Sequence, residues 1–176
     1  MKFTELQIPG VWLIAPEPVS DERGSFSRLN CAEEFASLGL CTSWLQVSES
    51  YNIAAGTLRG LHWQDAPHSE TKLIRCVHGA IFDVIVDIRE KSPTYGRWTS
   101  IELNAGTNNQ IYIPAGCAHG FQTLSDYTRV TYQISSAYTP ASARGIRWND
   151  PALAIVWPIP EPIMSRKDKN LDQFAQ

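Results

Sequence analysis

The chain has 176 residues, of which 43% are hydrophobic and 19% charged, and its formal net charge is −3. This length and composition predict a single domain over residues 1–176, large enough to bury a hydrophobic core. The slight negative charge argues against nucleic-acid binding, which requires a basic face. The apolar stretches are too short to cross a bilayer, and the one at residues 11–15 is confined by Pro9 and Pro16, so a signal peptide is not indicated. A cytoplasmic protein without a membrane or nucleic-acid partner is expected.

One helix is expected near the N-terminus, after a strand at residues 6–15. Asn30 is a good N-cap, and Glu33 follows three residues later as in a capping box. Gly39 can end this helix.

Strands dominate the rest of the chain. Residues 73–77 and 80–88 predict a hairpin whose turn contains Gly79. Further short strands are predicted at residues 98–103, 110–113, 120–124 and 129–135. Turn residues separate these strands, which favours an antiparallel sandwich or closed barrel over alternating βα units. The proline-interrupted tail after Trp148 is expected to wrap over this all-β domain.

Basic and imidazole side chains concentrate in residues 56–79, although the chain as a whole is acidic. In a strand, His62 and Gln64 point to one face while Leu61 and Trp63 point to the other. This pattern predicts a strand that lines a cavity. The polar members of the segment are Arg59, His62, Gln64, His68, Lys72 and Arg75.

A metal site is not favoured by the candidate ligands. His62, His68 and His119 supply imidazoles, but a transition-metal site in a barrel also needs a carboxylate. Gln64 is a poor ligand, and Glu70 lies in a predicted loop. The four cysteines form no CxxC pair and are expected to be reduced and mostly buried, with Cys117 in a loop beside His119; they are Cys31, Cys41, Cys76 and Cys117. We therefore expect no metal and no cofactor.

General acid–base chemistry is the better hypothesis. A histidine titrates near neutrality, so His62 can remove and return a proton, unless it is simply a satisfied core histidine. Lys72 or Arg59 can stabilise developing negative charge, and Tyr132 can act as the acid. Phosphate binding would depend on separate cations, since no glycine-rich phosphate loop is present; the candidates are Arg23, Arg59 and Lys167. Nucleophilic catalysis is not indicated, because the chain has no GxSxG motif.

Long ungapped motifs across nearly the whole chain identify a resemblance. They are DERGSF at 21–26, GTLRGLHWQ at 56–64, KLIRCVHGAIFDVIVDIR at 72–89, SPTYGRW at 92–98, IPAGCAHGFQTLSD at 113–126 and GIRWNDPAL at 145–153. The sequence resembles the nucleotide-sugar 3,5-epimerases of the dTDP-4-dehydrorhamnose 3,5-epimerase family. The resemblance implies a cupin-type jelly-roll barrel with short helical decorations, a homodimer, and a reaction without metal or cofactor.

The resemblance also implies a role for each matching residue. The substrate would be a nucleoside-diphosphate 4-keto-6-deoxyhexose that is inverted at C3 and C5. His62 would be the base, Asp168 its carboxylate partner, Lys72 the group that stabilises the enolate, and Tyr132 the acid. The implied substrate-binding residues are Arg59 and His119 at the sugar diphosphate, Arg23 from the neighbouring subunit, Tyr138 on the nucleobase, Lys167 as a further contact, and Gln46.

Three positions depart from the family pattern. Arg28 stands where the family often has Glu, Ser48 where it often has Asn, and Ala143 where it often has Glu. All three lie among binding positions, so they leave open which nucleotide and sugar are used. The alternatives are a mono-epimerase acting at C3 or C5, a sugar-nucleotide-binding cupin without activity, and a metal-dependent oxygenase.

Overall fold

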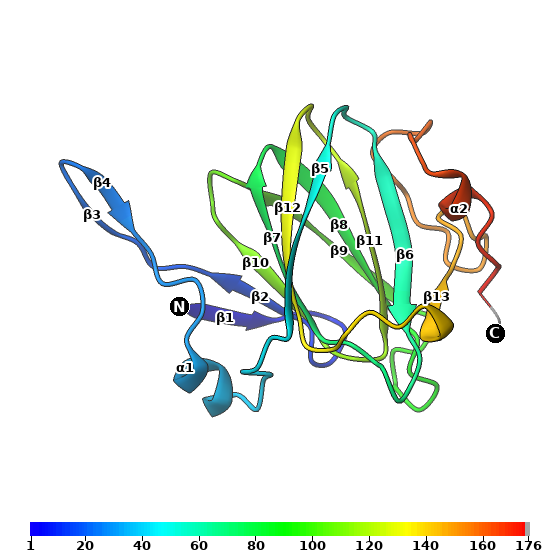
Figure 1. The fold of residues 1–176 in the computed structure, drawn as a ribbon, viewed down its shortest axis with the longest axis horizontal. Helices are drawn as coiled ribbons and strands as arrows, with labels where there is room; N and C mark the ends of the chain where they lie inside the picture. The colour runs from blue at the N-terminus through cyan, green and yellow to red at the C-terminus, as the bar shows by residue number, and fades with distance from the viewer. Residues whose placement is uncertain (175–176) are drawn as a thin grey trace.

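The computed structural model describes residues 1–174 and contains two antiparallel β-sheets that face each other (Figure 1). In spatial order, the six-stranded sheet consists of β1 (Lys2–Glu5), β2 (Trp12–Ala15), β10 (Gln110–Ile113), β7 (Lys72–His78), β12 (Thr128–Ile134) and β5 (Gln46–Asn52). The five-stranded sheet consists of β13 (Ala143–Gly145), β6 (Leu58–Gln64), β11 (Cys117–Thr123), β8 (Ala80–Asp87) and β9 (Trp98–Asn104). The predicted all-β cupin-type jelly-roll barrel is confirmed.

The remaining elements are small. A hairpin of β3 (Val19–Asp21) and β4 (Gly24–Phe26) projects away from the barrel (Figure 1). The helices are α1 (Ala32–Ser37), a 3₁₀ turn at Pro140–Ser142 and α2 (Arg166–Lys169), which lies beside β6. Within residues 1–174, no helix has the length and apolar character needed to span a membrane.

Strand β8 separates two hydrophobic clusters, as its alternating sequence predicts. Ile81 and Ile85 point between the two sheets, where they join the core that β7, β10 and β12 complete. Val84 and Val86 point outward and are covered by the C-terminal tail, through Leu153, Ile155 and Trp157. The tail therefore wraps over the barrel, as expected, and removes the outer face of the five-stranded sheet from water.

The predicted hairpin around Gly79 is wrong. Strand β7 pairs with β10 and β12, whereas β8 pairs with β9 and β11, so the chain crosses from one sheet to the other at Gly79. The link is one residue long, and hairpins normally need at least two. Gly79 has φ +77°, and an added Cβ would lie 2.4 Å from Thr128 Oγ1, which explains why glycine occupies this corner.

Two N-terminal predictions also need correction. The predicted strand at residues 6–15 is a turn over its first half, where Leu6 N–H donates to Val11 O at 2.8 Å, and only β2 remains extended. The N-cap of α1 is Cys31 rather than Asn30, and no side chain caps the helix. Asn30 instead donates to Gln133 Oε1 at 3.1 Å. The helix does end before Gly39, which has φ +70°.

Strand β6 carries a bulge opposite β11. His62 pairs with His119 and Arg59 with Phe121, so β6 has one more residue than β11 between these pairs. Gly60 occupies the bulge with φ +114°, and an added Cβ would lie 2.6 Å from Gly120 Cα. Because the bulge interrupts the alternation, Arg59 and His62 both line the space between the sheets, while Leu61 lies in the outer cluster.

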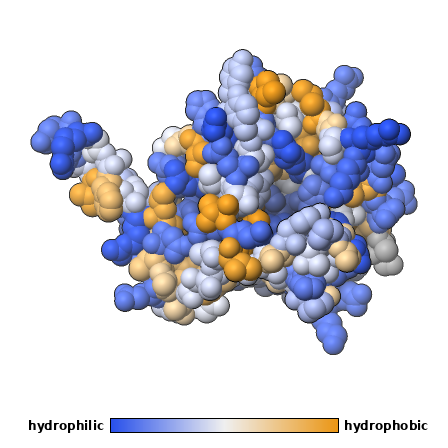
Figure 2. All heavy atoms as spheres, in the orientation of Figure 1, coloured by the Kyte–Doolittle hydropathy of each residue, from blue (hydrophilic) through white to orange (hydrophobic). Residues whose placement is uncertain are grey.

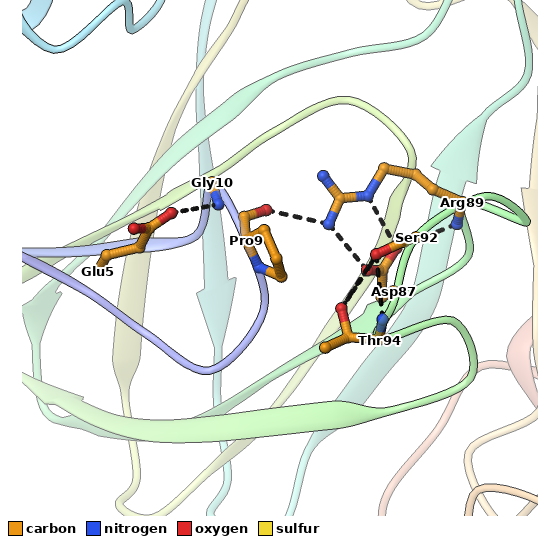
Figure 3. A network of polar contacts seen from close by, with 7 residues as sticks. All are labelled: Glu5, Pro9, Gly10, Asp87, Arg89, Ser92 and Thr94. Carbon is orange, nitrogen blue, oxygen red and sulfur yellow. Dashed lines mark hydrogen bonds and ion pairs between the residues drawn. The ribbon is translucent and has the colours of Figure 1, made fainter.

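A buried carboxylate fixes the loop between β8 and β9 (Figure 3). Asp87 is fully buried and accepts hydrogen bonds from Arg89 Nε at 2.8 Å, Ser92 Oγ at 2.6 Å and Thr94 Oγ1 at 2.6 Å. Arg89 also donates to Pro9 O at 3.0 Å, which ties this loop to the β1–β2 turn. Burial alone would raise the pKa of Asp87, but these donors outweigh it and hold the pKa well below its usual range.

We expect Asp87→Asn to lower the free energy of unfolding by roughly 3 kcal/mol at pH 7, because Arg89 would lose its buried partner. A carboxyl whose pKa is depressed on folding contributes stability above its unfolded pKa, and this contribution is lost as the pH falls through the folded value. The difference between wild type and variant should therefore shrink below about pH 4. Urea unfolding at several pH values measures it. The exposed Glu90→Gln in the same loop is the control, with an effect within about 0.5 kcal/mol.

Candidate active site

A cavity of about 330 Å³ lies between the two sheets, close to the edge where β5 and β6 face each other. Three of the four expected reacting groups come from separate strands, and the fourth comes from α2. The residues that line the cavity are Gln46, Ser50, Arg59, His62, Glu70, Lys72, His119, Phe121, Tyr132, Ile134, Tyr138 and Asp168. The cavity thus brings together His62, Lys72, Tyr132 and Asp168.

His62 and Asp168 form an acid–base pair across the cavity wall. His62 Nε2 lies 2.8 Å from Asp168 Oδ1, and the His62 side chain remains 40% exposed while that of Asp168 is 8% exposed. Burial would raise the pKa of Asp168, but the hydrogen bond and charge of His62 outweigh burial and lower it. An ionised Asp168 therefore orients an imidazole that is open to the cavity.

The tail delivers Asp168 to strand β6 through backbone contacts. Ile163 N–H donates to Gly56 O, and Leu58 N–H donates to Ile163 O, both at 2.9 Å. Ser165 then caps α2, because its Oγ accepts from Asp168 N–H at 3.0 Å. These contacts place a residue from the end of the chain against a strand near its middle.

Lys72 is almost fully buried and has two oxygen partners. Its Nζ lies 2.9 Å from Glu70 Oε1 and donates to His62 O at 3.2 Å. The side chains of Lys72 and Glu70 are 9% and 12% exposed. A positive charge is therefore held on the cavity wall beside the backbone of His62.

His119 has a buried carboxylate partner. Its Nε2 lies 2.8 Å from Asp83 Oδ2, and Asp83 is fully buried. Burial is the main cause that raises the pKa of Asp83, with the charge of His119 acting in the opposite direction. The expected loop at Cys117 is wrong, since β11 begins there, and burial raises the pKa of this thiol to about 12. Cys117 is therefore an unreactive core residue.

Tyr132 reaches the cavity from the opposite sheet to His62. Its ring lies 6.4 Å from that of His119, at an interplanar angle of 74°. Burial, followed by the negative charge of Asp83, raises the pKa of Tyr132 well above its usual value. The phenol therefore stays protonated at neutral pH and can donate a proton.

A wider groove of about 810 Å³ adjoins the cavity on the outer side of β6 and β13. His62, Glu70 and Tyr138 line both spaces, so they mark the junction. Lys167 and Ala143 line the groove but not the cavity. Arg59 lines the inner cavity, where its Nε donates to Asn52 Oδ1 at 2.7 Å.

Four predicted positions fall outside these walls. Ser48 pairs with Tyr132 in register and sits between the lining residues Gln46 and Ser50, but it is exposed and lines neither space. Arg23 is 83% exposed on the projecting hairpin and pairs with Asp21. Arg28 is 64% exposed and pairs with Glu34 at 3.3 Å. His68 lies in the loop before β7, where its carbonyl accepts from Gln64.

Three residues of this region were not predicted as site residues. Glu70 is two positions from Lys72, Ser50 shares the inward face of β5 with Gln46, and Asp83 is one of two acidic residues, with Asp87, in the otherwise apolar strand β8. A carboxylate in a buried strand was the usable signal for Asp83. Within residues 1–174, no group of three or more His, Cys, Asp or Glu side chains is arranged to hold a metal ion.

Comparison with known proteins shows the family of the chain. The family model described as dTDP-4-dehydrorhamnose 3,5-epimerase matches residues 5–176. A 3,5-epimerase of this name from Sinorhizobium fredii is 42% identical over 177 residues, covering 100% of this chain and 91% of the relative. A dTDP-4-dehydrorhamnose 3-epimerase from Streptomyces niveus is 38% identical over 177 residues, covering 100% of this chain and 85% of the relative.

Solved structures agree over the same length. The crystal structure of dTDP-4-dehydrorhamnose 3,5-epimerase from Elizabethkingia anophelis superposes with a TM-score of 0.96 at 37% identity, covering 99% of this chain and 96% of that one. The enzyme from Legionella pneumophila, solved with dTDP-4-keto-L-rhamnose, gives 0.91 at 36% identity, covering 98% and 92%. Sequence and fold thus coincide along the whole chain, which belongs to the dTDP-4-dehydrorhamnose 3,5-epimerase family.

Proposed function

We propose that this protein is an isomerase that inverts C3 and C5 of dTDP-4-dehydro-6-deoxyglucose and so forms dTDP-4-dehydrorhamnose. The observation that carries this proposal is the arrangement of His62 and Tyr132, which reach one cavity from opposite sheets. A base and an acid on opposite sides of a sugar ring can replace a proton on one face by a proton on the other. The family to which the chain belongs supports the same reaction.

The first step is removal of a proton next to the C4 ketone. C3 and C5 both lie beside this carbonyl, so the electron pair of either C–H bond can move onto the C4 oxygen as an enolate. Asp168 engages Nε2 of His62, which leaves Nδ1 to accept the proton. Lys72 then stabilises the enolate oxygen, because a cation fixed in a water-poor cavity needs no reorganisation when the charge develops.

Return of a proton completes the inversion. The Tyr132 hydroxyl donates to the opposite face of the carbon, and the C4 carbonyl forms again. The raised pKa of Tyr132 suits this task, because the phenol carries its proton when the enolate forms. Solvent then removes the proton from His62 and restores the one on Tyr132. The second carbon is inverted by the same steps.

The nucleoside diphosphate would extend from the cavity into the outer groove. We assign Arg59 and His119 to the sugar diphosphate, Tyr138 to the nucleobase, and Lys167 to a further contact at the groove wall. Gln46 and Ser48 would contact the substrate at the cavity edge. Ala143 stands in the groove where the family often has Glu, so the groove lacks the carboxylate of that Glu. A preference for thymidine over other nucleosides would therefore depend on the remaining groove residues.

We also propose a homodimer in which Arg23 and Arg28 of one subunit complete the site of the other. The β3–β4 hairpin extends beyond the barrel, and its paired residues Val19 and Phe26 are 75% and 79% exposed (Figures 1 and 2). On edge strand β5, Val47 is 76% exposed. An exposed apolar pair on a projecting hairpin and an exposed apolar residue on a sheet edge suit contact with a second copy.

A mono-epimerase that inverts only C3 is the second candidate. It is favoured by the Streptomyces niveus relative, which has the narrower activity at almost the same identity. Deuterium incorporation from heavy water separates the two, since each carbon that loses its proton gains a deuteron.

In heavy water, NMR should show deuterium at both C3 and C5 of the sugar. His62→Asn should slow exchange at both carbons by about 10³-fold, since no other base replaces it, while dTDP binding measured by calorimetry stays near that of the wild type. Exchange at one carbon would establish the mono-epimerase. Binding without exchange by the wild type would show a sugar-nucleotide-binding cupin, and normal exchange by His62→Asn would refute the assigned base.

Tyr132→Phe should separate proton exchange from inversion. Without the phenol, His62 can still remove a proton, exchange it with solvent and return a deuteron to the same face. We expect net inversion, followed by NMR of the product, to fall by about 10²-fold while deuterium exchange at the first carbon falls much less. Equal losses of exchange and inversion would contradict the role of Tyr132 as the acid.

Phe26→Asp should weaken the proposed dimer, because it places a charge in an apolar contact. Light scattering should give twice the chain mass for the wild type and an increased monomer fraction for the variant. Glu22→Gln at the hairpin tip is a control that keeps the apolar pair. A monomeric wild type would refute the dimer and the assignment of Arg23 to a neighbouring site.

A further inference from the structure

Gln64 is a buried polar residue to which the proposed reaction gives no role. It lies two positions after His62 on β6, is 3% exposed, and lines the wider groove rather than the inner cavity. Its Oε1 accepts from Thr139 N–H at 2.6 Å, and its Nε2 donates to Ala137 O at 3.1 Å. The side-chain amide therefore holds the backbone on both sides of Tyr138.

The same amide holds the loop before β7. Gln64 Nε2 also lies 3.0 Å from His68 O and from Glu70 Oε2, so its two N–H bonds are shared among these two oxygens and Ala137 O. The other oxygen of Glu70 lies 2.9 Å from Lys72 Nζ. One side chain thus connects the loop that carries Tyr138 with the carboxylate that holds Lys72.

The N–H donors of Lys72 explain how the contact between Gln64 and Glu70 can affect the reaction. An ammonium group has three N–H bonds. Two point to Glu70 Oε1 and His62 O, which leaves one for an oxygen in the cavity. Because the lysine stem is flexible, these two acceptors determine where the third N–H points. Without Glu70, the ammonium would lose its direction as well as its only ion-pair partner among residues 1–174.

We infer that Gln64 and Glu70 are positioning residues, which together link the nucleobase-binding loop to the cation that stabilises the enolate. This inference rests on the proposed function, in which Tyr138 contacts the nucleobase and Lys72 the C4 oxygen. Glu70 acts on Lys72 alone, whereas Gln64 acts on Lys72 through Glu70 and also on the loop that carries Tyr138. The substitutions at the two positions therefore have different kinetic signatures.

Glu70→Ala should lower kcat by about 10²-fold, the effect expected when a reacting group is misplaced by about 1 Å. KM and the dissociation constant for dTDP should change less than about threefold, because the loop of Tyr138 is untouched. Gln64→Leu should lower kcat and also weaken dTDP binding. Gln64→Glu keeps the acceptor for Thr139 N–H but removes the donors to Glu70 and Ala137 O and places a second carboxylate beside Glu70, so kcat should fall while dTDP binding weakens less than in Gln64→Leu.

A double-mutant cycle tests whether Glu70 acts through Lys72. On a Lys72→Met background, Glu70→Ala should cost less than about threefold in kcat, since the group that it positions is gone. The exposed Glu102→Ala on β9 is the control for loss of a carboxylate and should match the wild type. Thermal unfolding of each variant shows whether a loss of activity comes from unfolding, and Gln64→Glu remains informative if Gln64→Leu does not fold.

The outcomes separate this inference from the proposed function. A wild type without deuterium exchange would refute the function itself. A wild type with normal exchange, together with Glu70→Ala within threefold of its kcat, would refute the positioning role alone. Independent losses from Glu70→Ala and Lys72→Met would also refute it, because they would show that Glu70 does not act through Lys72.

Discussion

The cost of placing charges between two apolar sheets governs the arrangement of this protein. Three carboxylates reach the space around the cavity, and each lies within 2.9 Å of a basic nitrogen, in the pairs Asp168–His62, Glu70–Lys72 and Asp83–His119. An unpaired charge in such a place would cost several kcal/mol or lose its ionisation. His62, Lys72 and His119 therefore each have an acidic partner, whereas Arg59 donates to the neutral Asn52 Oδ1 instead.

The bulge at Gly60 adds a second constraint, on which side chains face inward. Simple alternation along β6 places His62 and Gln64 on one face and Arg59 with Leu61 on the other. Because the extra residue breaks this alternation, the structure places Arg59 inside with His62. A glycine is required there, since the backbones of β6 and β11 approach too closely for a Cβ.

These constraints explain which features the sequence could predict. The inward face of β6, the alternation of β8 and the covering tail follow from local patterns of apolar and polar residues, and all agree with the structure. The crossing at Gly79 could not be predicted in this way, because strand partners depend on contacts far along the chain. The same holds for Glu70, which lies in a loop by every local signal yet contributes to the cavity wall. The resemblance to a family supplied Asp168 and Tyr138, whose positions no local pattern indicates.

The contact between His62 and Asp168 also bears on how the protein matures. The two residues are 106 positions apart, and the intervening chain forms three of the six strands of one sheet and four of the five strands of the other. Contacts of such separation form late in folding, since a long loop must be closed first. During synthesis the barrel can begin to assemble while the tail is still inside the ribosome. We therefore expect His62 to gain its contact with Asp168 only after the tail has covered the outer cluster. A nascent chain would then have a folded barrel before it has a complete active site.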